Sequence, residues 1–100
     1  MTTTLTKESN VFTVTPVGRF TTDAATDFLK ALDPLTQERG VSVVLELSGL
    51  EFISSAGLRC FVMLLKTCQA NGSSLVLRHP APQIVDILSL TALLDKFVVE

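Results

Sequence analysis

The sequence predicts an α/β domain with a mixed, mostly parallel β-sheet of about four to five strands flanked by three to four helices. Apolar, strand-like segments alternate along the chain with segments whose apolar residues recur at helical spacing. The length of 100 residues suits one domain, which we expect to span residues 1–100. A hydrophobic content of 47% with 18% charged residues is typical of a packed globule.

The first predicted element is a hairpin. Residues 11–17 read V-F-T-V-T-P-V, an alternation of apolar and polar side chains that is typical of a strand. Residues 5–7 are expected to pair with it across a turn at residues 8–10. Pro16 suits a sheet edge or a strand end, and Gly18 is expected to break the strand.

A helix is predicted next. Residues 21–23, Thr-Thr-Asp, offer an N-cap. The apolar residues that follow at the spacing i, i+3, i+4, i+7 share one helical face and are Ala25, Phe28, Leu29 and Leu32. Pro34 ends this helix or closely follows its end, because the residue before a proline disfavours helical backbone.

The centre of the chain is predicted to form a buried strand and a second helix. Residues 41–47 are almost continuously apolar, which is typical of a strand buried on both faces. The apolar run continues through residues 50–53 to the polar stretch at residues 54–57. Residues 57–70 then place Phe61, Leu64, Leu65 and Cys68 on one helical face. Asn-Gly at residues 71–72 suits the left-handed end of that helix.

The last quarter predicts another strand and helix. Residues 74–78 form a third core strand, and residues 79–82 form a turn whose final proline suits the first position of a helix. Ile84, Ile87 and Leu88 give this helix an apolar face. The apolar tail at residues 93–99 must be covered, as a short helix or a strand.

Composition argues against several classes of function. The net charge is −2 and the 8 Lys and Arg residues are scattered, so we expect no nucleic-acid partner. Cys60 and Cys68 are eight residues apart on a predicted helix, about 12 Å, too far for a disulfide. With one histidine, no metal site is expected, nor any cofactor. Without a signal-peptide layout or a membrane-length apolar run, the chain is expected to be cytoplasmic, with no direct membrane insertion.

The junction at residues 46–59, ELSGLEFISSAGLR, concentrates the functional signals. It leads from a buried strand through a polar loop into a helix, the kind of place where α/β sheets bind ligands and partners. The helix dipole favours negative charge there. Two interpretations of Ser54 and Ser55 remain open. A serine here caps the helix, or one of the two accepts a phosphate, which adds about −1.5 to −2 charges.

This stretch resembles the signature of the STAS domain, which anti-sigma factor antagonists share with the tails of sulfate transporters. Residues 18–20, 71–77 and 87–93 resemble the family's flanking segments, so the resemblance spans nearly the whole chain. In the antagonists the motif is usually D-S-S-G or D-S-A-G, and the serine directly after the aspartate is phosphorylated. The resemblance therefore implies that Ser55 is the phosphoacceptor.

The sequence departs from the family's pattern at three positions. Ser54 stands where the motif has its aspartate, so the acidic neighbour of the acceptor is missing. Thr21 stands where an acidic residue often precedes the first helix, and Asp23 lies two residues further on. Ala92 replaces a late glycine.

The resemblance implies a partner-switching protein. The unphosphorylated domain would capture an anti-sigma factor serine kinase, the kinase would phosphorylate Ser55 with its bound ATP, and a PP2C-like phosphatase would reset the switch. Val62 and Met63 are predicted on the solvent side of the helix after the motif. The partner-binding residues that we expect are Thr22, Asp23, Ser54, Ser55, Ala56, Gly57, Leu58, Arg59, Val62 and Met63.

The alternatives to a switch are a constitutive subunit and an enzyme. STAS-like proteins also serve as constitutive subunits of lipid-transport ATPases and as stressosome-type scaffolds, and the serine at position 54 favours this alternative slightly. An enzyme is not expected. A serine hydrolase needs a base beside its nucleophile, and the one histidine, His79, lies in a predicted surface turn. The chain has no G-x-S-x-G elbow and no phosphate-binding glycine loop.

Overall fold

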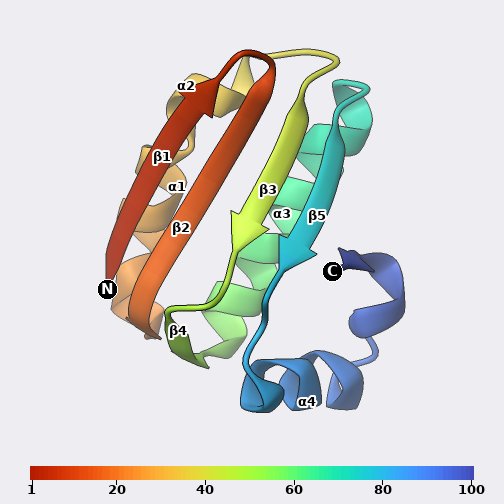
Figure 1. Cartoon of the computed structure of the whole chain (residues 1–100). Coiled ribbons are helices and arrows are strands. Elements are labelled where there is room, and N and C mark those ends of the chain that lie inside the picture. Colours follow the sequence, from red (N-terminus) through yellow and green to blue (C-terminus); the bar gives the residue numbers. More distant parts are fainter.

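A six-stranded mixed sheet organises the chain in the computed structural model, which describes residues 1–100 (Figure 1). The strands are β1 (Thr2–Glu8), β2 (Val11–Phe20), β3 (Ser42–Glu46), β4 (Leu50–Ile53), β5 (Ser74–Arg78) and β6 (Val98–Val99). Their order is β1-β2-β3-β5-β6, and β4 pairs with β2. The β1–β2 pair is antiparallel and all the others are parallel. The α/β class is confirmed, with six strands instead of four to five.

Helices cover one face of the sheet. They are α1 (Ala25–Ala31), α2 (Asp33–Thr36), α3 (Ser55–Ala70) and α4 (Pro82–Leu90), with 3-10 turns η1 (Thr22–Ala24) and η2 (Leu94–Lys96). Figure 1 shows α1, α2 and α3 behind the sheet and α4 beyond the end of β5, which leaves the other face of β1, β2, β3 and β5 uncovered. The predicted stop near Pro34 is confirmed, since α1 ends at Ala31 and the proline lies in the first turn of α2. No helix has both the length and the hydropathy to cross a membrane.

Strand β2 differs most from the sequence-based prediction. Gly18 does not break the strand: its φ of +107° and a register shift at this point let the chain continue to the buried Phe20. Pro16 is buried inside the sheet and not at its edge. Residues 11–14 pair with β3 and residues 18–20 pair with β4, so the proline lies where β2 changes neighbours and only β1 pairs with it. A missing N–H is tolerated at such a gap.

The core lies between the sheet and helices α1, α3 and α4. Twenty-two buried residues form one cluster. The rings of Phe20 and Phe28 have centroids 4.9 Å apart, and Phe61 of α3 lies 6.0 Å from both. Aromatic pairs at this separation are stabilising beyond their buried area. This aromatic cluster brings the end of β2, helix α1 and the first turns of α3 together.

The core face of α3 extends further toward its start than predicted. Phe61, Leu64 and Cys68 are buried as expected, but Leu65 is only half-buried and the first two turns add Gly57, Leu58 and Cys60. Both cysteines are free and buried, and this burial raises the pKa of each thiol.

The apolar tail is only partly covered. Phe97 is buried and β6 pairs with β5, but Val98 and Val99 remain 62% and 39% exposed. The prediction that the whole tail must be covered is therefore wrong for β6. A two-residue strand at the sheet edge lacks the length to bury both of its faces.

Candidate functional site

The junction between β4 and α3 is built around Ser54. Its extended backbone (φ −82°, ψ 170°) makes it the N-cap of α3, and its Oγ accepts a hydrogen bond from Gly57 N at 3.2 Å. Its own N–H donates to the carbonyl of Phe20 at 2.8 Å, and its carbonyl accepts from Leu58 N at 3.0 Å. Capping, the first of the two open interpretations, therefore applies to Ser54.

Ser55 has a different environment, although it is the next residue. It is the first residue of α3, its side chain is exposed, and its hydroxyl forms no hydrogen bond within the protein. The first turn of α3 contains no acidic residue, so nothing of like charge lies on the helix beside this hydroxyl. A negative group there would interact favourably with the positive end of the helix dipole.

Gly57 fixes the start of the helix against the sheet. A Cβ at this position would lie 2.7 Å from Cγ1 of Ile53 and 2.9 Å from the ring of Phe20, closer than real Cβ contacts. The absence of a side chain lets α3 approach β2 and β4 directly. Gly57 and Leu58 are both buried, Leu58 at 8% exposure, so neither residue presents a surface to a partner. The predicted partner surface is corrected by removing these two residues.

The other predicted site residues are accessible. Thr22 and Asp23 lie exposed in η1, which contacts α3. Along α3, Arg59 and Met63 are exposed, whereas Ala56 and Val62 are half-buried. The structure therefore brings two segments that are about 30 residues apart in the sequence together beside the start of α3.

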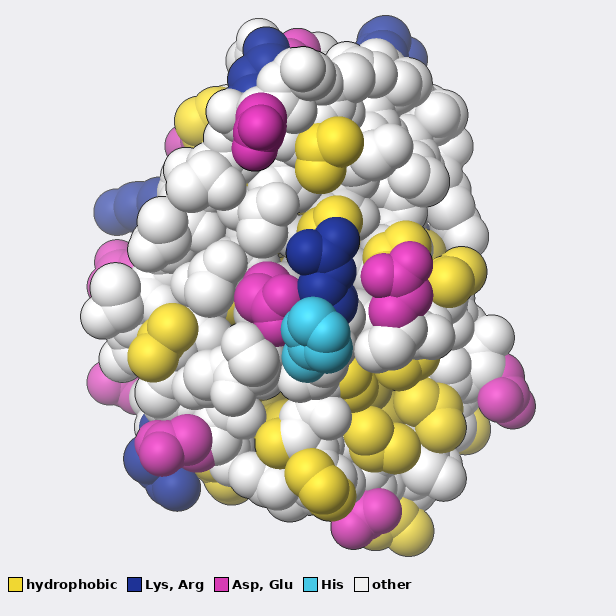
Figure 2. Space-filling view, in the orientation of Figure 1, with side chains coloured by type: hydrophobic (Ala, Val, Ile, Leu, Met, Phe, Trp, Pro, Cys, Tyr) yellow, Lys and Arg dark blue, Asp and Glu magenta, His cyan; other side chains and the backbone are white.

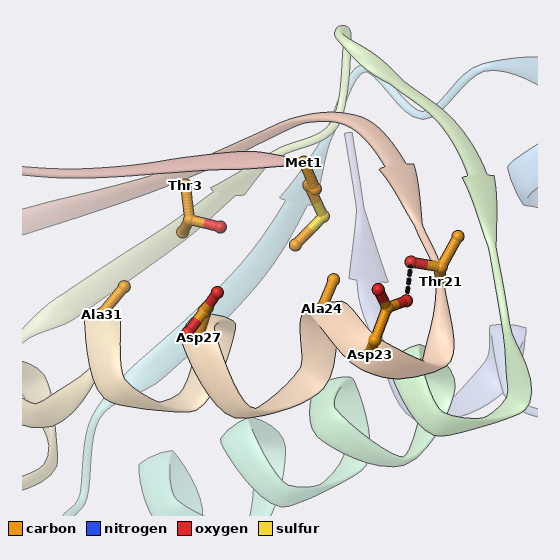
Figure 3. A pocket seen from close by; sticks show the side chains of 7 residues that line it. All are labelled: Met1, Thr3, Thr21, Asp23, Ala24, Asp27 and Ala31. Atoms are coloured by element: carbon orange, nitrogen blue, oxygen red, sulfur yellow. Dashed lines mark hydrogen bonds between the residues drawn. The ribbon is translucent and has the colours of Figure 1, made fainter.

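A polar hollow adjoins the η1 segment between β1 and α1 (Figure 3). Figure 3 shows the side chains of Met1, Asp23 and Asp27 around it. Thr21 Oγ1 donates to Asp23 Oδ1 at 2.6 Å, and this hydrogen bond holds the pKa of Asp23 below its usual range. Asp27, which also lines the hollow, was not among the predicted site residues, although its i+4 spacing from Asp23 indicates a shared helical face.

A separate charged cluster lies on the uncovered face of the sheet. Figure 2 shows the one histidine there, beside a basic side chain and between acidic ones. His79 Nδ1 lies 3.2 Å from both carboxylate oxygens of Glu46, and Arg78 Nη1 lies 4.0 Å from Oε1. Partial burial alone would raise the pKa of Glu46, but hydrogen bonds from Ser48 and His79 outweigh it and hold the pKa below its usual range.

This cluster gives no support to hydrolase chemistry. His79 contacts Glu46 and forms no hydrogen bond with Ser54 or Ser55, so neither serine has a base beside it. A serine nucleophile depends on such a base. No three His, Cys, Asp or Glu side chains are placed to hold a metal ion.

Comparison with known proteins agrees with this fold. The family model described as "Mlab, STAS domain" matches residues 3–100. The chain therefore belongs to the STAS domain family, as the residues of the junction indicated. No curated protein sequence matches the chain.

Several solved structures share the fold. The anti-sigma factor antagonist SpoIIAA in its unphosphorylated form is 13% identical, with a TM-score of 0.83 over 99% of this chain and 88% of that one. A serine-to-glutamate variant of RsbS from Moorella thermoacetica is 19% identical, with a TM-score of 0.81 over 98% and 85%. An anti-sigma-factor antagonist (STAS) domain protein from Planctomyces limnophilus is 21% identical, with a TM-score of 0.79 over 97% and 87%. At these identities the likeness establishes the fold.

Proposed function

We propose that this STAS domain is a protein-binding switch whose state is set by phosphorylation of Ser55. The observation that carries the proposal is the division of roles between two adjacent serines. Ser54 uses its hydroxyl oxygen to cap α3, whereas Ser55 presents an exposed hydroxyl without a partner. A kinase requires an accessible hydroxyl, and modification of this one would break no hydrogen bond of the fold.

The proposed chemistry follows from that hydroxyl. An anti-sigma factor serine kinase would transfer the γ-phosphoryl group of its ATP, so that the bond to Ser55 Oγ forms as the bond to ADP breaks and the kinase takes up the hydroxyl proton. A PP2C-like phosphatase would hydrolyse the phosphate and reset the domain. The domain itself would bind and not catalyse. The kinase uses intracellular ATP, so the proposed location is the cytoplasm.

The proposed contact surface surrounds Ser55. After removal of the two buried residues it comprises Thr22, Asp23, Ser54, Ser55, Ala56, Arg59, Val62 and Met63. A phosphate at the start of α3 would be tolerated by the domain, because the helix dipole favours it. An apposed acidic or apolar partner surface would not tolerate it. Phosphorylation would therefore act through the interface and leave the fold intact.

The test combines mass spectrometry with binding. Protein isolated from its native cells should carry one phosphate on the peptide that holds both serines, localised to Ser55. Ser55→Ala should retain the partner kinase in pull-down, whereas Ser55→Asp should lose it. Ser54→Ala, which leaves the acceptor hydroxyl in place, is the matched control and should still be phosphorylated. A partner bound equally by the Ser55→Asp and wild-type proteins would contradict the proposal.

A second candidate is a constitutive subunit of a lipid-transport ATPase or of a stressosome-type scaffold. Two observations favour it: the matching family model is described as "Mlab, STAS domain", and Ser54 occupies the position where the antagonists carry an acidic residue. On this reading Ser55 is a contact residue without a phosphate cycle. Co-purification with an ATPase subunit at a fixed ratio, with no phosphate on Ser55 under any growth condition, would favour the second candidate over the first.

A further inference from the structure

The exposed face of α3 carries two basic side chains, and the helix itself contains no balancing acid. The helix contains Arg59 and Lys66 but no aspartate or glutamate, although the chain as a whole has 10 acidic and 8 basic residues. Neither side chain forms an ion pair, since the salt bridges of the structure involve Lys7, Arg78 and His79. This face is therefore locally positive on a protein of net charge −2.

A groove with an apolar floor runs beside this face, between α3 and η2. Its lining residues are Val62, Leu65, Lys66, Gln69, Leu93 and Lys96. The three apolar side chains are half-buried, and the two lysines are exposed. Lys96 also has no ion pair, and its acidic neighbour Asp95 is not among the lining residues. We call this feature the α3–η2 groove.

We propose that the α3–η2 groove binds an acidic amphipathic segment of a partner protein. This inference rests on the proposed function, because it treats the domain as a protein-binding module. It adds the chemistry of the partner. Apolar side chains of the segment would cover Val62, Leu65 and Leu93, and its carboxylates would face Lys66 and Lys96. An amphipathic helix laid into a groove is a recurring mode of peptide recognition, and complementary charge at the rim selects the partner.

Distance separates this groove from the phosphoacceptor. Arg59 lies four residues after Ser55, about 6 Å along the helix axis, and Lys66 lies eleven residues after it, about 16 Å. The Debye length in physiological salt is about 8 Å. A phosphate on Ser55 would therefore act on Arg59 and be largely screened from Lys66. The groove should keep its affinity for an acidic segment in both states of the switch.

A protein segment fits this charge pattern better than a membrane does. Recruitment to anionic lipid usually takes clusters of about four to eight basic residues. The face offers only Arg59, Lys66 and Lys96, set in a chain of net charge −2. Two lysines beside an apolar floor, with Arg59 further along the same helix, suit a partner that contributes both carboxylates and apolar side chains.

The experiment uses three synthetic amphipathic peptides that share the same apolar positions and carry glutamate, glutamine or lysine at every polar position. Each is titrated into the full ¹⁵N-labelled chain and followed by amide NMR shifts. The glutamate peptide should shift amides of α3 and η2, bind at least tenfold more tightly than the lysine peptide, and weaken as salt is added. The double variant Lys66→Glu/Lys96→Glu should remove the preference for the glutamate peptide, a change in the ratio of the two affinities on the order of ten- to thirtyfold.

The matched control is Lys30→Glu, an exposed lysine of α1 that does not line the groove, which should leave the peptide order unchanged. Thermal melts identify any variant that fails to fold, and the single variant Lys66→Glu then serves as the milder charge reversal in the groove. Ser55→Asp should bind the glutamate peptide within about threefold of wild type. Peptide binding without any phosphate on Ser55 would leave the groove proposal standing and refute only the switch.

Four outcomes would overturn the proposal. The first is equal binding of all three peptides, and the second is a shift map that avoids α3 and η2. The third is self-association of the chain through the groove, in which case a second copy is the occupant. The fourth is binding of vesicles rich in anionic lipid in preference to the glutamate peptide.

Discussion

Alanine substitution at Ser54 and at Ser55 should separate the cap from the phosphoacceptor. Ser54→Ala removes the oxygen that accepts from Gly57 N at 3.2 Å and leaves a part-buried N–H without a partner. Loss of such an N-cap costs about 1 kcal/mol, within a range of about 0.5–2 kcal/mol. In a domain of this size that lowers Tm by roughly 4–8 °C per kcal/mol. Ser55→Ala removes an exposed, unpaired hydroxyl and should change stability by less than about 0.5 kcal/mol.

Acidic substitutions sharpen the distinction. Ser54→Asp keeps a capping oxygen, so its stability should match wild type within about 0.5 kcal/mol. Ser55→Asp places a charge in the first turn of α3, which contains no acidic residue, and should stabilise the fold by about 0.3–1 kcal/mol. At position 55 the variant with Asp should therefore be more stable than those with Ser and Ala. At position 54 the proteins with Ser and Asp should be more stable than the one with Ala.

Urea unfolding followed by circular dichroism measures all four variants. The midpoints are compared at a constant m value, because a changed slope would indicate an altered denatured or native state. Two results would refute the reasoning. If Ser55→Ala loses as much stability as Ser54→Ala, then Ser55 is structural. If Ser55→Asp is clearly destabilised, then the start of α3 does not tolerate negative charge and phosphorylation would unfold the domain locally.

Three further substitutions test the surrounding fold. Gly57→Ala places a Cβ 2.7 Å from Ile53 Cγ1, and overpacking of about 1–3 kcal/mol should exceed the roughly 1 kcal/mol gained in helix propensity, so a raised urea midpoint would contradict the packing. Ala92→Gly relieves a left-handed φ of +59° and should raise stability by about 1 kcal/mol, with no gain as the opposing result. Because the pKa of Glu46 is lowered in the fold, its stabilising effect is present above the ordinary carboxyl pKa of about 4.3 and is lost as pH falls through the folded pKa. Glu46→Gln should therefore flatten the acid side of the stability profile, and an unchanged profile would argue against that coupling.

Local signals in the sequence predicted the second half of the fold closely. Strand β5 spans the predicted residues 74–78, and Pro82 occupies the first turn of α4. Gly72 adopts the left-handed φ of +65° that was expected after α3. Each of these features depends on one residue type and its immediate neighbours, so no knowledge of distant contacts was needed.

Elements that depend on distant partners could not be predicted in this way. Strand β2 continues beyond Gly18 because β4 lies beside residues 18–20. In the sequence β4 is about thirty residues away, so no local pattern near Gly18 indicates it. The apolar run at residues 50–53 indicated burial but not a strand. Pro16 was predicted at a sheet edge or a strand end. The gap between β3 and β4 that tolerates it inside the sheet is revealed only by the order of the strands.

The site was predicted in outline but not in its division of roles. Ser54 and Ser55 are both good capping residues, and the exact first residue of α3 decides which of them caps. The predicted helical face began at Phe61 and so missed three buried positions, Gly57, Leu58 and Cys60. Gly57 and Leu58 lie four and three residues before Phe61, so the same periodicity, continued backward, would have placed both in the core.

The packing under the junction determines how a modification there can act. Gly57 has no room for even one methyl group, and Phe20 beneath it lies 4.9 Å from Phe28 in a buried aromatic cluster. A close-packed interior transmits strain and does not deform smoothly. Because of this packing, α3 cannot shift in response to a charge added to the exposed hydroxyl of Ser55. The effect of the charge must appear at the surface, as attraction to the helix dipole and Arg59 within the domain and as repulsion toward an apposed partner.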